Sequence, residues 1–321
     1  MRCRGVLIGA VSLSLAGVAC AGEAAREWLD RMNTAIEEQT YIGNFVHLRV
    51  QDAKADTMRV AHLYEDGMVS ERIVSLDGVG REIIRRDENV RCILPDREVV
   101  LLEEGFDSNP LVSALPSYSQ TLEVHYRLKV FSTDRVAGRE TQVIAISPRD
   151  DYRYGYVLWL DVETAMPLRS RLWGKDKQVI EEIIFTSIEY PDSIDEAAFQ
   201  PSVVTDGFTE LRSRKPPAEI VSGIPWRVEN PPEGFELTAS TRKAIAGSEH
   251  PVEHLVYSDG LATVSVFVQD PANTTDLAEG FSTLGSTNAY SLTLDDRRIT
   301  AIGEVPRRTV ETIANSLRPA R

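Results

Sequence analysis

One pattern of chemistry-bearing residues in this chain suggests a metal site: the segment His250-Pro251-Val252-Glu253-His254. The order H-x-x-E-H occurs in inverted zinc peptidases, where two imidazoles on one helical face hold zinc and the glutamate activates water. Pro251 is tolerated only at a helix start, and the residues after His254 alternate as in a strand. The sequence therefore favours ordinary polar residues leading into a strand over zinc hydrolysis.

The other groups able to do chemistry show no catalytic arrangement. His47, His62 and His125 are scattered through strand-like segments and are expected to be partly solvated. Cys92 lies in a strand pattern and is expected to be a small buried hydrophobe rather than a reactive thiol. Neighbouring carboxylates are frequent, but adjacent strand residues point to opposite faces, so these acids are expected to provide solubility. No catalytic residue, metal or cofactor is therefore expected, and the chain is not expected to be an enzyme.

The N-terminus predicts export. Arg2 and Arg4 precede an apolar run at 5–19, and Ala19-Cys20-Ala21 has the small-x-small form of a signal peptidase site. We expect cleavage near Ala21, and Cys20 leaves a lipid anchor open as an alternative. Cleavage removes two arginines and no acid, which takes the formal net charge from −14 to −16. Such a charge argues against binding nucleic acid or an anionic membrane through bulk attraction.

The stretch 136–190 organises the rest of the chain, because it reads as consecutive strands separated by short polar turns, and such strands must run antiparallel. The predicted strands are Thr141–Ser147, Gly155–Asp161, Pro167–Trp173 and Val179–Tyr190. Upstream, Ala24–Gln39 carries an apolar stripe at helical spacing, and strand patterns fill 41–103 and Leu122–Phe131. About ten strands exceed what one flat sheet carries, so the sheet is expected to curl around the helix.

The predicted fold class is α+β, with a large antiparallel half-barrel that has helices on its concave side and a small α+β domain at the C-terminus. A proline-containing stretch without periodicity separates the two. The expected divisions are a signal peptide at 1–21, the large domain at 22–210, a linker at 211–226 and the small domain at 227–321.

The curved sheet leaves two interpretations of its apolar residues, a lipid-binding cavity or a filled core. The candidates for lining a cavity are Phe45, Met58, Val60, Tyr64, Val124, Tyr126, Leu158 and Trp173.

A second group of candidates lies on loops, which are either recognition surfaces or solvated turns. One is the charged, aromatic loop after the first strand of the organising stretch, and the others are a hairpin and a strand end in the tail. The candidates for partner binding are Arg149, Arg153, Tyr154, Tyr257, Ser258, Asp259, Gly260, Glu304 and Pro306.

A series of motifs in this order resembles the MucB/RseB family across nearly the whole mature chain. In the large domain the motifs are Val136-Ala137-Gly138-Arg139, Ser147-Pro148-Arg149-Asp150, Arg153-Tyr154-Gly155, Leu158-Trp159-Leu160-Asp161 and Pro167-Leu168. In the tail they are Trp226, Pro231-Pro232-Glu233-Gly234-Phe235, Tyr257-Ser258-Asp259-Gly260-Leu261, Ser265-Val266-Phe267, Asn288-Ala289-Tyr290 and Gly303-Glu304-Val305-Pro306.

The resemblance implies a periplasmic, non-catalytic regulator whose large domain is similar to the lipoprotein carrier LolA. It implies binding to the periplasmic part of a membrane-anchored anti-sigma factor (MucA or RseA). That binding shields the factor from the site-1 protease and restrains the envelope-stress sigma factor. Lipopolysaccharide or lipoprotein acyl chains are the implied signal, and a homodimer is left open. The alternative is a periplasmic lipid or lipoprotein carrier of the LolA type.

Overall fold

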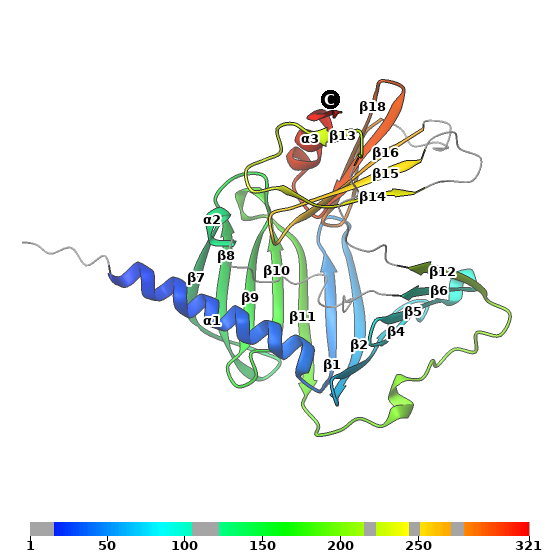
Figure 1. Cartoon of the computed structure of the whole chain (residues 1–321). Helices are drawn as coiled ribbons and strands as arrows, with labels where there is room; N and C mark the ends of the chain where they lie inside the picture. The colour runs from blue at the N-terminus through cyan, green and yellow to red at the C-terminus, as the bar shows by residue number, and fades with distance from the viewer. Residues whose placement is uncertain (1–15, 105–121, 215–222, 244–250, 271–278, 321) are drawn as a thin grey trace, which may run out of the picture.

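A long helix lies across one face of a large curved sheet, and a smaller sheet with its own helix lies at one end of that sheet (Figure 1). The structure is a computed structural model that describes residues 16–104, 122–214, 223–243, 251–270 and 279–320. Most of the expected signal peptide, residues 215–222 of the expected linker and His250 lie outside these ranges. No helix among the described residues is both long and apolar enough to span a membrane.

The large sheet has 12 strands in the order β12-β6-β5-β4-β3-β2-β1-β11-β10-β9-β8-β7. The upstream strands are β1 (Tyr41–Arg49), β2 (Lys54–Glu65), β3 (Met68–Ser75), β4 (Glu82–Arg86), β5 (Asn89–Leu94) and β6 (Val99–Glu104). The downstream strands are β7 (Tyr126–Val136), β8 (Arg139–Pro148), β9 (Gly155–Asp161), β10 (Pro167–Trp173), β11 (Val179–Glu189) and β12 (Thr209–Arg214). The predicted curved antiparallel sheet is confirmed, and β9 and β10 have the predicted bounds.

The helix α1 (Ala16–Glu38) buries its apolar stripe on the concave face of the sheet. Leu29 and Met32 are fully buried against a core that includes Val60, Leu158 and Phe185. Alternation along the strands places these core residues on one face, because successive strand side chains point to opposite sides. The concave face is therefore covered by α1, as the stripe predicted.

Two parts of the sheet differ from the prediction. Leu122–His125 forms the short helix α2, so strand β7 begins only at Tyr126. Strand β12 pairs with β6 in parallel, from Thr209 with Val99 to Arg214 with Glu104, within the stretch expected to begin an irregular linker. A parallel partner must come from a distant part of the chain, and no local pattern in the sequence indicates it.

The small domain is a six-stranded antiparallel sheet in the order β14-β15-β16-β19-β18-β17, packed against α3 (Arg307–Asn315). Its strands are β14 (Glu236–Lys243), β15 (Val252–Ser258), β16 (Thr263–Gln269), β17 (Gly280–Leu284), β18 (Thr287–Leu294) and β19 (Arg297–Gly303). A two-stranded ladder of β13 (Trp226–Val228) and β20 (Leu317–Pro319) closes the tail. The predicted hairpin of β15 and β16 is confirmed, and α3 is the helix of the expected α+β domain, whereas β17, β18 and the closing ladder were not predicted.

His62 is fully buried, contrary to the expectation of a partly solvated residue. Its ring stacks on Tyr41 with centroids 5.1 Å apart, and its Nδ1 lies 3.0 Å from the Gln39 carbonyl oxygen at the end of α1. Burial lowers the pKa of His62 from 6.5 to about 4, against the opposing effect of that hydrogen bond. The alternating pattern in the sequence could not show this burial, because the groups that cover His62 are Tyr41 and the chain at the end of α1.

The buried His62 predicts a loss of stability in acid. Between pH 6.5 and about 4, His62 binds a proton in the unfolded chain but stays neutral in the folded chain. The free energy of unfolding should therefore fall by about 3 kcal/mol as the pH drops through this window. In urea unfolding from pH 7 to pH 4, His62→Gln should flatten the profile. An unaltered slope in His62→Gln would contradict the assignment.

Candidate functional site

A buried ion pair joins the two domains. The Arg153 Nε donates to Asp259 Oδ2, and both side chains are 0% exposed. Arg153 comes from the loop between β8 and β9, and Asp259 from the turn between β15 and β16. The other Asp259 oxygen accepts from the N–H groups of Leu261 (2.9 Å) and Ala262 (2.7 Å), which shapes that turn. The carboxylate is thus fixed by its own hairpin before it meets the arginine.

The rest of the environment satisfies the charge on Arg153. Its Nη1 donates to Asp150, and its Nη2 donates to the Glu233 carbonyl oxygen of the small domain. Its guanidinium lies 4.9 Å from the Phe235 ring centroid, a cation–π distance. Tyr126 donates its hydroxyl to Asp259 Oδ2 at 3.0 Å. Buried charges are tolerated only when paired and hydrogen-bonded in this way, so the geometry between the domains is closely specified.

A second set of polar contacts lies beside the ion pair. Asn288 Nδ2 donates to the Tyr154 hydroxyl at 2.9 Å, and Thr309 Oγ1 donates to the Tyr152 carbonyl oxygen at 2.7 Å. The Ser286 N–H donates to Glu181 Oε1 at 2.7 Å. Burial raises the pKa of Tyr154 to about 12, so its hydroxyl stays protonated at neutral pH. Each contact joins a residue between β8 and β11 to the small domain. Together the contacts fix one orientation of the two domains.

Glu181 is the charged residue of this second set of contacts. Burial opposes its ionisation, but hydrogen bonds from His47, whose Nε2 lies 3.2 Å from Glu181 Oε2, and from Ser286 hold the pKa of Glu181 below its usual value. Glu181 therefore stays ionised and accepts the small-domain N–H, while Glu304 lies exposed at the rim.

Close packing completes the contact. Gly234 has φ +85°, and a Cβ there would lie 2.1 Å from His125 Nε2. Only glycine therefore fits where the chain before β14 passes α2. Tyr152 packs against the small-domain core, and Leu261 packs against the large-domain core. We name the whole contact, from Arg153–Asp259 to Glu181–Ser286, the interdomain junction.

The junction brings most of the predicted partner-binding residues together, but not as a free surface. Arg153, Tyr154, Tyr257 and Asp259 are between 2 and 8% exposed, which corrects the expectation that the whole loop and hairpin are accessible. Tyr257 packs in the small-domain core, where its hydroxyl accepts the Val228 N–H. The candidates left exposed or half-exposed at the rim are Arg149, Ser258, Gly260, Glu304 and Pro306.

The predicted lipid-lining residues are divided by the structure. Phe45, Val60, Tyr126 and Leu158 are at most 4% exposed in the core covered by α1, so in this arrangement they line no open cavity. The others are accessible to different degrees: Met58 and Tyr64 are half-buried, Val124 is 63% exposed on α2, and Trp173 lies on the opposite face of the sheet.

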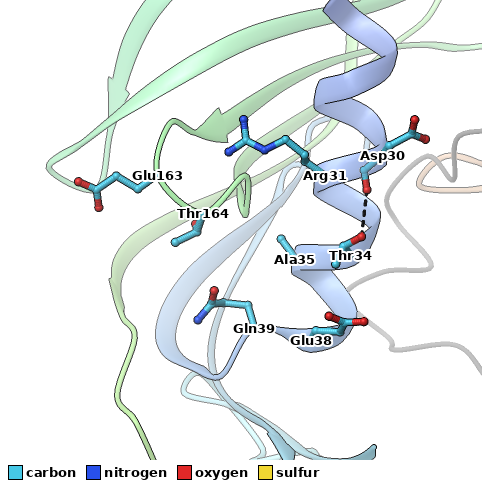
Figure 2. Close-up of a pocket in the computed structure, with 8 residues that line it drawn as sticks. All are labelled: Asp30, Arg31, Thr34, Ala35, Glu38, Gln39, Glu163 and Thr164. Atoms are coloured by element: carbon cyan, nitrogen blue, oxygen red, sulfur yellow. Dashed lines mark hydrogen bonds between the residues drawn. The ribbon is translucent and has the colours of Figure 1, made fainter.

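A hollow of about 590 Å³ beside the end of α1 has polar walls (Figure 2). Asp30, Glu38 and Glu163 surround it together with Arg31, and Thr34 Oγ1 donates to the Asp30 carbonyl oxygen at 3.3 Å. These walls do not suit an acyl chain.

The remaining predicted groups have ordinary structural partners. Glu253 accepts from Arg242 Nε at 2.9 Å, and His254 stacks on Phe267 with its Nε2 3.0 Å from Ser265 Oγ. Among the described residues no group of three or more His, Cys, Asp or Glu is placed to hold a metal ion. Cys92 is half-buried in β5, and burial raises its pKa, which disfavours a reactive thiolate.

Sequence reasoning missed half of the junction. Glu181, Ser286, Glu233 and Phe235 were not site candidates, because their partners lie about a hundred residues away in the chain. The motif Pro231–Phe235 was the one signal in the sequence for this half. Its Gly234 follows two prolines and an acid and does not end a strand, which indicates that the glycine is needed for another reason.

The chain is similar to known proteins along almost its whole length. The family model for the MucB/RseB N-terminal domain matches residues 24–203, and that for the MucB/RseB C-terminal domain matches 221–318. The Pseudomonas aeruginosa "Sigma factor AlgU regulatory protein MucB" is 33% identical over 307 residues, covering 92% of this chain and 91% of that protein. The Haemophilus influenzae "Sigma-E factor regulatory protein RseB" is 28% identical, covering 96% of each chain.

A solved structure, "The complex structure of Pseudomonas aeruginosa MucA/MucB", matches with a TM-score of 0.72 and 31% identity. The match covers 93% of this chain and 99% of the other chain, so it extends over both domains.

The junction predicts that Asp259→Asn loosens the two domains without unfolding the hairpin. Asparagine keeps the Oδ1 acceptor of the turn and loses the charge that pairs with Arg153. Removing one partner of a buried ion pair costs about 3–5 kcal/mol, and the remaining pair of Arg153 with Asp150 places the expected cost at the lower end of this range. Hydrogen exchange at the Ser286 amide, which bonds across the junction, should speed up strongly. Asp192→Asn, an exposed acid of the large domain after β11, is the control and should exchange as the parent protein does.

Proposed function

The chain belongs to the MucB/RseB family, and from this we propose that it is a periplasmic regulator that binds the periplasmic part of a membrane-anchored anti-sigma factor. The observation that carries the proposal is the match of both domains together to MucB in its complex with MucA. The relatives are named as regulators of sigma factors, which makes the family regulatory rather than enzymatic. The exported leader expected at 1–21 agrees with a periplasmic location.

The contact surface that we propose is the rim of the interdomain junction. Arg149 from the large domain and Gly260 and Glu304 from the small domain remain exposed around the buried ion pair. A segment laid across this rim would touch both domains at once and would favour the docked arrangement over any other. Binding and docking would then strengthen one another through one coupling free energy.

Shielding from the site-1 protease follows if the cleavage site lies in the covered segment. Proteases act on extended, accessible backbone, and a segment held against two domains at once is released only when the complex dissociates. The protected fraction would then rise with the affinity of the regulator for the anti-sigma factor.

The sensing part of the proposal is that an acyl ligand in the large domain lowers this affinity. A ligand changes an equilibrium only through its different affinity for the two states. The concave face is covered by α1, whose Leu29 and Met32 are fully buried. A chain entering there would have to displace the helix, and Tyr126 of that core also bonds to Asp259 at the junction. A pure carrier is less well supported, because half of its expected cavity residues are packed under α1.

The proposed rim predicts that Glu304→Lys weakens binding to a synthetic peptide of the host's anti-sigma factor periplasmic segment. Reversing a rim charge typically changes the association rate and its salt dependence, and we expect an affinity change of about three- to tenfold. Isothermal titration gives the affinity, and the rate of peptide cleavage by the site-1 protease gives the shielding. The matched control is Glu163→Lys, since Glu163 is exposed far from the rim.

If the parent protein binds the peptide and slows its cleavage, the regulatory function stands. If Glu304→Lys then behaves as Glu163→Lys does, the rim is not the contact surface. If the parent protein neither binds nor shields the peptide, the proposed function itself fails.

A further inference from the structure

A groove of about 590 Å³ lies on the outer face of the large sheet, opposite α1. Strands β7 to β11 all contribute to it, and its apolar floor includes Val143, Val157, Trp159 and Trp173. Alternation places these side chains on the face away from the core residues Ile144 and Leu158. The volume is within the range of small-molecule sites. The groove is therefore open space with apolar walls, in contrast to the covered concave face.

Local geometry builds this groove from the sequence. The register between β7 and β8 shifts between Val130 and Thr133, a bulge that brings Phe131 to the groove edge, 46% exposed. Trp173 lies opposite Gly155 in the sheet, and a Cβ at Gly155 would come within 2.3 Å of the indole, so the floor depends on glycine at that position. Trp159 is only 7% exposed and donates its indole N–H to Asp134 Oδ2 at 2.9 Å.

The rim of the groove is cationic in a strongly acidic protein. Arg169 and Arg171 both stack on Trp159, at 4.4 and 5.4 Å from its ring, and both donate to the single carboxylate of Glu182. Lys177 lines the groove and is exposed, and the Lys129 ammonium lies 4.5 Å over the Phe131 ring. Among the residues that line the groove, Arg171 and Lys177 are cationic and Asp134 is acidic, while Arg169 and Lys129 lie beside these residues, in a chain of net charge −14.

From this arrangement we infer that the outer groove binds the alkyl chain of a single-chain anionic amphiphile, with Lys177 and Arg171 at its headgroup. An apolar floor flanked by cations is complementary to a molecule that is apolar along its length and negative at one end. A role for this ligand as a signal rests on the proposed function, whereas the binding itself does not. The groove belongs to the large domain alone, so its binding is testable without any anti-sigma factor.

The probe is 12-bromododecanoate, because bromine quenches indole fluorescence on close approach and the chain has 4 tryptophans. Trp159 and Trp173 line the groove, whereas Trp28 lies on α1 and Trp226 in the small domain. The full-length mature protein should show saturable quenching below the micelle concentration. Trp173→Phe should lose much of the quenchable signal, and Trp226→Phe should keep it. Loss in Trp28→Phe instead would place the ligand under α1 and overturn the inference.

The charge of the headgroup is tested by a matched pair. Lys177→Glu should weaken 12-bromododecanoate binding about three- to tenfold, as expected for reversing one exposed charge, and Lys175→Glu should not. Lys175 is exposed two residues away and does not line the groove. Equal effects of the two variants, or no saturable quenching of the parent protein, would overturn the inference. Failure here would leave the anti-sigma factor proposal standing, since its titration contains no amphiphile.

Discussion

The ion pair between Arg153 and Asp259 sets the relation between the two domains, because neither charge is exposed to water. Two buried charges are costly unless their geometry and remaining hydrogen bonds are nearly complete, so small displacements of either domain are unfavourable. The surrounding contacts from Tyr126, Glu233 and the hairpin amides meet that requirement. The pair therefore contributes less to total stability than to the choice of one arrangement among many.

Local features of the sequence predicted most of the helices and strands but not the contacts that make up the site. Gly155–Asp161 and Pro167–Trp173 were predicted with their bounds, because the turn beside each specifies its end. The strand β12 and the Asp259 pairing were not predictable, since their partners lie more than a hundred residues away. The structure brings most of the partner-binding candidates to one junction, but their burial could not be known before the domains were brought together.

The amphipathic stripe of α1 explains how a sheet of this curvature avoids an empty interior. A half-barrel without a ligand must fill its concave side with its own side chains, and Leu29, Met32 and Ile36 do so. The same helix end provides the carbonyl that bonds His62, and its core includes Tyr126, which reaches the junction. A displacement of α1 would therefore reach the interdomain junction through Tyr126, which belongs to the core under α1 and bonds to Asp259.

The parallel pairing of β12 with β6 has a consequence for how far the domains can separate. Backbone pairing anchors the chain to the large sheet as far as Arg214, and the small domain begins its first strand at Trp226. The tether between the domains is thus, in sequence, no longer than the residues between Arg214 and Ile224, since Ile224 packs on the small-domain core. A short tether keeps two modules at an effective concentration on the order of millimolar. A small domain that undocks should consequently redock faster than two separate molecules would associate.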